Sequence, residues 1–225
     1  MRIGGFKKLA DVLEAARNLP PPEPEPEAPI SPPGSDTPPA TVKGVPRARL
    51  WDTFAAFDLT LNPGMKAAVE RCKAVAAGKA WCALLAGEFG TGKTHLAIAA
   101  FLERKEQGTA GYFWKVPVFL DWLRYHTFDE EGMGFQAAIR IYERAEGLVV
   151  FDDLGAENPT DWAHEQLYRV LDSRYDLRLP TIITTNQPLD RIDGRIRSRF
   201  REGLVVCAGR DVRTRKGGRD GMPPE

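Results

Sequence analysis

The stretch Gly87-Glu88-Phe89-Gly90-Thr91-Gly92-Lys93-Thr94 decides the fold class of this chain, because it fits the phosphate-loop pattern of Gly, four residues and Gly-Lys-Thr. An apolar run at residues 81–86 precedes it and indicates a buried strand, and residues 95–104 follow it with a helical pattern. Glycine lets backbone N–H groups curl around an anion without Cβ clashes, and a helix N-terminus adds partial positive charge. The strand, loop and helix together therefore predict a phosphate-binding site.

Two side chains at the end of this loop carry its expected chemistry. Lys93 can reach the β- and γ-phosphates of a nucleotide, and the Thr94 hydroxyl can take a position on Mg²⁺. ATP and Mg²⁺ are therefore the expected cofactors, and we count residues 87–94 and the adjoining His95 as nucleotide-binding. A glycine-rich turn between two ordinary elements is the alternative, but both flanks argue against it.

Polar residues end two further apolar runs. Residues 148–153 read L-V-V-F-D-D, so a buried strand would deliver two carboxylates to the sheet edge where ligands bind. Asp152 would coordinate Mg²⁺ through its water shell, and Asp153 would orient or deprotonate the attacking water. Residues 181–186 end in Asn186, which could hold that water or sense the γ-phosphate. The alternatives are a strand that enters a polar loop and an Asn that caps a turn.

Composition limits the choice of partners and compartment. The 225 residues have a formal net charge of zero, but residues 191–219 hold ten Arg or Lys against three acids. The five arginines at residues 191–201 could also form a solvated face. The cysteines Cys72, Cys82 and Cys207 form no C-x-x-C pair, which argues against a zinc module or a disulfide framework. A reducing, cytoplasmic location fits. No signal peptide is visible and no apolar run approaches a membrane span, so we expect no membrane partner.

The N-terminal region differs from the rest of the chain. Residues 1–19 show the spacing of a short amphipathic helix, and residues 20–46 contain eleven prolines, which predict an extended, semi-rigid linker. The helix is too short to be stable alone, so it either docks on a partner or folds back on its own domain. The candidate docking residues are Ile3, Phe6, Leu9 and Leu13.

Four motifs in this order resemble the DnaC-type helicase loaders and the related IstB-type transposition ATPases of the AAA+ superfamily. They are G-E-F-G-T-G-K-T-H-L-A, V-V-F-D-D-L-G-A-E, I-I-T-T-N and R-S-R-F, and the likeness covers about residues 50–215. The resemblance implies an α/β P-loop NTPase fold with a parallel five-stranded sheet between helices and no C-terminal lid domain. It assigns residues 47–215 to an AAA+ ATPase domain and leaves 216–225 as a basic, frayed tail.

The resemblance also implies roles for single residues. Lys93 and Thr94 would be Walker A residues, Asp152 and Asp153 Walker B residues, and Asn186 the sensor 1 residue. Arg199 matches the arginine finger that reaches the ATP of a neighbouring subunit, and Arg213 resembles the C-terminal sensor arginine. Residues from about 116 to 145 correspond to loader-specific helices that line a pore for single-stranded DNA. The basic residues expected to bind DNA there are Lys115, Arg124, Arg140 and Arg144.

Three functions follow as hypotheses. The first is a helicase loader that oligomerises with ATP at subunit interfaces, grips single-stranded DNA and delivers a hexameric replicative helicase, with slow, switch-like ATP hydrolysis. The second is a transposition helper of the IstB type that grips duplex DNA. The third is a small-molecule phosphotransferase, which would need neither Asn186 at a strand end nor an arginine finger. The tethered N-terminal helix favours the loader.

Overall fold

The computed structural model describes residues 44–109, 111–127 and 134–211. The predicted N-terminal helix with Ile3, Phe6, Leu9 and Leu13, most of the linker, Arg213 and the basic tail lie outside the described residues. The core described below belongs to the predicted ATPase domain.

A parallel sheet of five strands forms the centre of the molecule, in the order β2-β3-β4-β1-β5. The order differs from the chain order because each parallel pairing needs a crossover, which here is made by helices. The strands are β1 (Cys82–Gly87), β2 (Tyr112–Lys115), β3 (Val149–Leu154), β4 (Thr181–Thr185) and β5 (Leu204–Cys207). The predicted five-stranded parallel sheet is confirmed.

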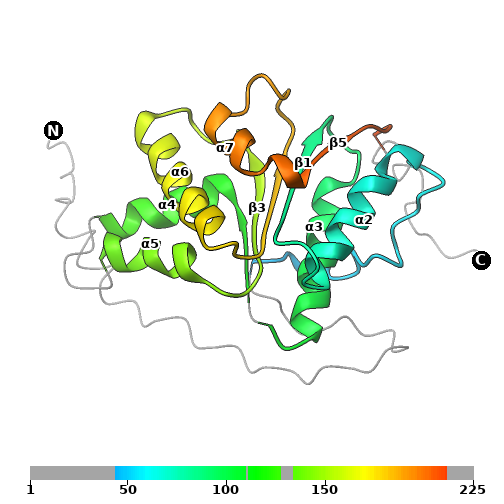
Figure 1. The fold of residues 1–225 in the computed structure, drawn as a ribbon, viewed down its shortest axis with the longest axis horizontal. Coiled ribbons are helices and arrows are strands. Elements are labelled where there is room, and N and C mark those ends of the chain that lie inside the picture. Colours follow the sequence, from blue (N-terminus) through cyan, green and yellow to red (C-terminus); the bar gives the residue numbers. More distant parts are fainter. Residues whose placement is uncertain (1–43, 110, 128–133, 212–225) are drawn as a thin grey trace, which may run out of the picture.

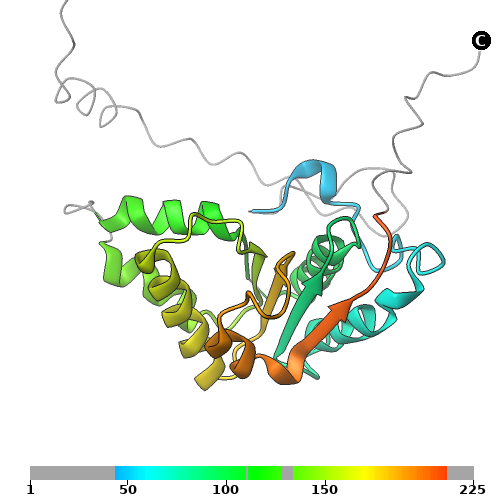
Figure 2. The ribbon, with the colours of Figure 1, turned by 90° about the horizontal axis from the view of Figure 1, so that it is seen from above.

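Helices cover both faces of this sheet, as Figures 1 and 2 show. One layer consists of α2 and α3, which lie on one side of the sheet in Figure 1, and the other consists of α4, α5, α6 and α7. Their bounds are α2 (Lys66–Ala76), α3 (Lys93–Glu106), α4 (Val116–Thr127), α5 (Phe135–Arg144), α6 (Asp161–Asp176) and α7 (Gly194–Arg199).

The alternation of side chains along the strands explains the two layers. On β1, Ala83 and Leu85 belong to the apolar cluster shared with α2 and α3, whereas Cys82 and Leu84 belong to the cluster on the opposite face. Successive side chains of a strand point to opposite faces, and a parallel sheet covered on both faces needs apolar residues at every position. The uninterrupted apolar runs in the sequence follow from this requirement.

A single buried arginine joins the second helical layer to the sheet. Arg174 of α6 is completely buried, and its guanidinium donates to Thr181 Oγ1 at 2.9 Å and to the carbonyl oxygens of Tyr142, Ala145, Gly147 and Pro180. Burial lowers the pKa of this guanidinium to about 9, so Arg174 remains charged at neutral pH. The end of α5, the approach to β3 and the start of β4 are thus held by one side chain.

After β5 the described chain continues to Asp211 without a further helix, in agreement with the absence of a lid domain up to that point. The three cysteines, all within the described ranges, are buried and form no disulfide. Within these ranges no helix has the length and apolar character that crossing a bilayer requires.

Candidate nucleotide site

The phosphate loop connects the carboxyl end of β1 to the first residue of α3, as the sequence predicts. Gly90 and Gly92 have φ values of 74° and 104°, in the left-handed region that glycine adopts without strain. A Cβ atom at Gly92 would lie 2.6 Å from the ring of Phe57, so this position also requires the smallest residue. The loop and the N-terminus of α3 form the arrangement that binds phosphate in P-loop proteins.

Lys93 lies across the loop that precedes it. Its side chain is buried, and Nζ donates to the carbonyl oxygens of Gly87 at 2.8 Å and Glu88 at 2.7 Å. The ammonium group is therefore held at the centre of the loop, where a nucleotide phosphate would meet it.

Asp152 and Thr94 meet at the carboxyl edge of the sheet. Thr94 Oγ1 donates to Asp152 Oδ1 at 2.8 Å, and Thr184 Oγ1 donates to the same oxygen at 2.7 Å. Asp152 is completely buried, and this burial raises its pKa above the ordinary value. The hydrogen bonds from Thr184 and Thr94 lower the pKa and so partly offset the effect of burial. Its other oxygen, Oδ2, is buried without a hydrogen-bond partner. A hydroxyl and a carboxylate with an unsatisfied oxygen fit Mg²⁺, which prefers oxygen ligands.

Asp153 and Asn186 are also brought together. Asn186 Nδ2 donates to Asp153 Oδ1 at 3.2 Å, and the Asp153 N–H donates to Thr184 Oγ1 at 3.0 Å. Asp153 has a φ of 61°, and the pairing of β3 with β4 shifts register between Phe151 and Leu154. Such a bulge re-aims a side chain, and here it turns Asp153 toward the end of β4.

Comparison with known proteins identifies the family. Residues 52–198, more than half of the chain, match the family described as IstB-like ATP binding protein. The chain belongs to this IstB-like ATP-binding family. A search of the curated proteins found no match.

Solved structures share the fold of this IstB-like protein. The crystal structure of the DnaC helicase loader has a TM-score of 0.61 at 23% identity and covers 72% of this chain and 99% of that chain. The crystal structure of DnaI has a TM-score of 0.59 at 22% identity, with 74% and 93% covered. The structure of the replication initiator DnaA bound to AMPPCP and single-stranded DNA has a TM-score of 0.61 at 22% identity. The match covers 70% of this chain and 50% of that chain, so this chain spans about half the length of that protein. At 22–23% identity, these likenesses concern the fold.

His95 is engaged by the segment that precedes α2. Its Nε2 lies 2.8 Å from the carbonyl oxygen of Thr53 and therefore donates to it, and its Nδ1 lies 3.5 Å from Asp52 Oδ1. The ring also contacts Phe57 edge-on at 5.2 Å between centroids. In this IstB-like protein His95 thus connects the start of α3 to the N-terminal segment, and its predicted contact with nucleotide stays a proposal.

A buried asparagine just before α2, which the sequence analysis did not single out, joins three parts of the chain. Asn62 is 2% exposed, and its Nδ2 donates to the carbonyl oxygens of Thr91 at 3.2 Å and Arg210 at 3.0 Å. Its Oδ1 accepts from the Arg210 N–H at 2.8 Å. The chain after β5 is thereby fixed beside the phosphate loop, and the Asp211 carboxylate lies against Gly90.

Arg199, the candidate arginine finger, lies on α7 and is held by α6. Its Nε donates to Asp172 Oδ1, and its guanidinium lies 4.9 Å over the ring of Tyr168. Tyr168 and Asp172 are four residues apart on one helix, so they share a face. The sequence contained this spacing, but nothing in it linked that face to Arg199.

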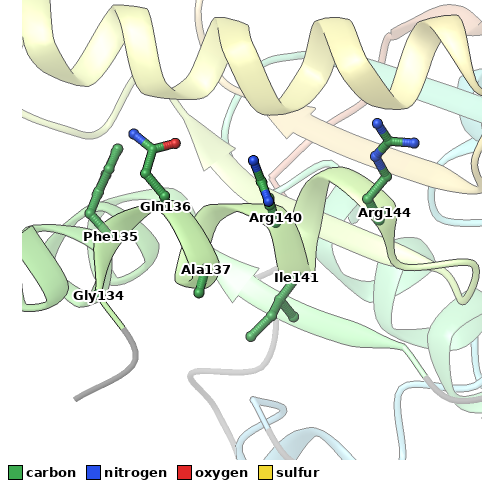
Figure 3. A pocket seen from close by; sticks show the side chains of 7 residues that line it. All are labelled: Gly134, Phe135, Gln136, Ala137, Arg140, Ile141 and Arg144. Carbon is green, nitrogen blue, oxygen red and sulfur yellow. The ribbon is translucent and has the colours of Figure 1, made fainter.

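Two of the four candidate DNA-binding residues line one pocket. Arg140 and Arg144 line a pocket of about 830 Å³ beside α5, and in Figure 3 they point to the same side as Phe135 and Gln136. Arg124 lies elsewhere on α4, 3.4 Å from Asp121 Oδ1 and 5.1 Å over the ring of Trp162. Lys115 is exposed at the end of β2 and is aligned with Asp152 of β3.

Proposed function

We propose that this protein hydrolyses ATP with Mg²⁺ and uses the ATP-bound state as a switch in loading a replicative helicase. The observation that carries the ATPase proposal is the meeting of Thr94 with Asp152, and of Asn186 with Asp153, at one edge of the sheet. The two carboxylates have different surroundings, so they can serve different roles. The family match supports the binding of ATP.

Each residue of the site has a defined part in the proposed reaction. Lys93 would exchange its bonds to the loop carbonyls for bonds to the phosphates, and Thr94 and Asp152 would hold the ion. Mg²⁺, when bound, supplies positive charge that neutralises the β- and γ-phosphates. Asn186 donates to Asp153 Oδ1 and so orients the carboxylate that would accept the proton of the attacking water.

The base assignment can be tested against a neighbouring carboxylate. Asp153→Asn should keep ATP bound and lower kcat by about 100-fold or more, which is the usual contribution of a general base, because an amide cannot accept the proton. Glu157 is the control, since its Oε2 accepts from the Gly155 N–H at 2.7 Å and so stabilises a turn. Glu157→Gln should retain most activity, and the opposite pattern would assign the base to Glu157.

The loader proposal adds single-stranded DNA, a hexameric helicase and self-association with ATP at the subunit interface. The pocket beside α5 supports the DNA contact, because it combines Arg140, Arg144 and the aromatic Phe135. Arginines contact phosphates and aromatic rings stack on bases in sequence-tolerant binding to single strands. The segment at residues 1–19 supplies the proposed docking helix for the helicase.

A pull-down tests the partner. Deleting residues 1–19, or the single change Leu9→Asp, should abolish capture of the hexameric helicase while ATP binding and DNA binding persist, since the apolar face would dock in a partner groove. Helicase capture at wild-type strength by both variants would place the docking surface on the ATPase domain.

The match to an IstB-like family keeps a second candidate, the transposition helper of the IstB type that we expect to bind duplex DNA. The two candidates differ in the form of DNA that the ATP-bound protein should bind, single-stranded for the loader and duplex for the transposition helper. Titration of single-stranded and duplex DNA of equal length, with ATP and at several salt concentrations, separates them. Tighter binding to duplex DNA and co-purification with a transposase would support the second candidate.

A further inference from the structure

One buried hydroxyl group contacts both carboxylate residues of β3. Thr184 of β4 is completely buried, and its Oγ1 donates to Asp152 Oδ1 at 2.7 Å and accepts from the Asp153 N–H at 3.0 Å. A threonine hydroxyl has one hydrogen to donate and lone pairs to accept, so both bonds can form at once. Thr184 therefore joins the residue proposed to hold the ion to the residue proposed to accept the proton.

The position of Thr184 in the sheet explains why its side chain makes these bonds. β3 and β4 pair Phe151 with Ile183 and Leu154 with Thr185, so Asp152 and Asp153 together lie opposite Thr184 alone. The Asp153 N–H therefore donates to the Thr184 hydroxyl, whereas in a regular β-ladder it would donate to a main-chain carbonyl of the neighbouring strand.

The backbone of Asp153 needs such support. Its φ of 61° lies in the left-handed region, which residues other than glycine rarely adopt. Conformations of this kind persist when the surrounding structure holds them, and they concentrate at functional sites. The Thr184 hydroxyl and the Asn186 amide are two groups that hold Asp153 in this conformation.

We propose that Thr184 is a positioning residue for ATP hydrolysis, whose hydroxyl sets the placement of Asp152 relative to Asp153. This inference rests on the proposed ATPase function. Thr185, the next residue, provides the contrast, because its hydroxyl is equally buried but donates to the Leu154 carbonyl at 2.7 Å and accepts from the Gln187 N–H at 3.0 Å. Two adjacent threonines therefore differ in whether they contact the carboxylates.

The experiment compares Thr184→Val, which has the same shape without the hydroxyl, with Thr184→Ser, which keeps the hydroxyl, and with the control Thr185→Val. Thr184→Val should lower kcat by about 10- to 100-fold and raise the Mg²⁺ concentration needed for half-maximal ATP binding, as loss of an outer partner of a metal ligand does. KM for ATP at saturating Mg²⁺ should change little. Thr184→Ser should restore both properties, and Thr185→Val should resemble the wild type.

A measurement without nucleotide tests the same hydrogen bond directly. The Asp153 amide should exchange its hydrogen at least about tenfold faster in Thr184→Val than in the wild type, because its acceptor is gone. Thr184→Ser should retain slow exchange. Thermal melting shows whether each variant is folded, and Thr184→Ala replaces the valine variant if that variant fails to fold.

Two results would overturn the proposal. One is a folded Thr184→Val with wild-type kcat, Mg²⁺ requirement and amide exchange, and the other is a Thr184→Ser that is as impaired as Thr184→Val. If the wild type binds but does not hydrolyse ATP, the ATPase proposal fails separately. Thr184 is then judged by the Mg²⁺ requirement and amide exchange, and wild-type values in Thr184→Val reject its role.

Discussion

We expect nucleotide affinity to depend most on Lys93. Its ammonium group makes two short hydrogen bonds to loop carbonyls, and charge-assisted bonds to phosphates would replace them when ATP binds. Lys93→Ala should therefore weaken ATP binding by about 100-fold or more, measured by equilibrium titration, since each such bond is worth about 1.5–3 kcal/mol. Lys105→Ala, an exposed lysine on the same helix, is the control and should bind ATP like the wild type. Unchanged affinity in Lys93→Ala would contradict the Walker A assignment.

Sequence patterns named the candidate residues of the nucleotide site but not their hydrogen-bond partners. Lys93, Asp152 and Asn186 could be predicted because loop spacing and strand ends indicate such residues directly. Thr184 and Asn62 could not be predicted, because a sequence does not show which side chains meet. Thr184 bonds to residues 31 and 32 positions away, and Asn62 bonds to residues 29 and 148 positions away. A threonine before a strand-end Asn and an Asn in a turn are both common in ordinary loops and strands.

At the scale of elements, Arg174 determines how α5 and α6 lie on the sheet. Replacing it by Met removes the guanidinium that donates to four carbonyl oxygens of neighbouring segments, of which the Pro180 carbonyl keeps the Val149 N–H as a donor. Arg174→Met should lower the free energy of unfolding by about 3 kcal/mol, which corresponds to a melting temperature about 6–12 °C lower. Thermal denaturation checks this, with Arg191→Met, an exposed arginine after β4, as a control that should melt like the wild type. A melting temperature unchanged by Arg174→Met would show that water or a rearranged helix replaces the guanidinium.

The strands and helices themselves could be predicted from the sequence, because their apolar patterns are long and regular. The helix predicted at residues 95–104, for example, corresponds to α3 at Lys93–Glu106. The bulge in β3 was not predictable, since residues 148–153 read as an uninterrupted strand. Such a bulge depends on the pairing partner, and the partner strand lies about thirty residues further along the chain.

At the scale of the whole molecule, Arg199 tests whether ATP hydrolysis needs a second subunit. Arg199→Ala should leave ATP binding and monomer folding intact but lower hydrolysis by about 10³-fold, the usual worth of an arginine finger. Arg197→Ala is the matched control on α7, because Arg197 is exposed and donates to the Leu189 carbonyl. Mixing Arg199→Ala with Lys93→Ala subunits should restore part of the activity, since each supplies what the other lacks. No restoration, together with hydrolysis by a wild-type monomer, would reject the role in trans.

The contacts of Asn62 also determine how the sequence of this protein can diverge. Asn62 binds the main-chain N–H and carbonyl of residue 210 and the carbonyl of residue 91, and none of these atoms depends on side-chain identity. Position 210 can therefore drift to any residue that keeps an N–H group, proline excepted, without loss of the contact. Asn62 itself has no such freedom, because its amide makes two donated hydrogen bonds and one accepted one there, whereas a hydroxyl has a single hydrogen to donate. The side chain at residue 210 can thus change while the main chain there stays bound beside the phosphate loop.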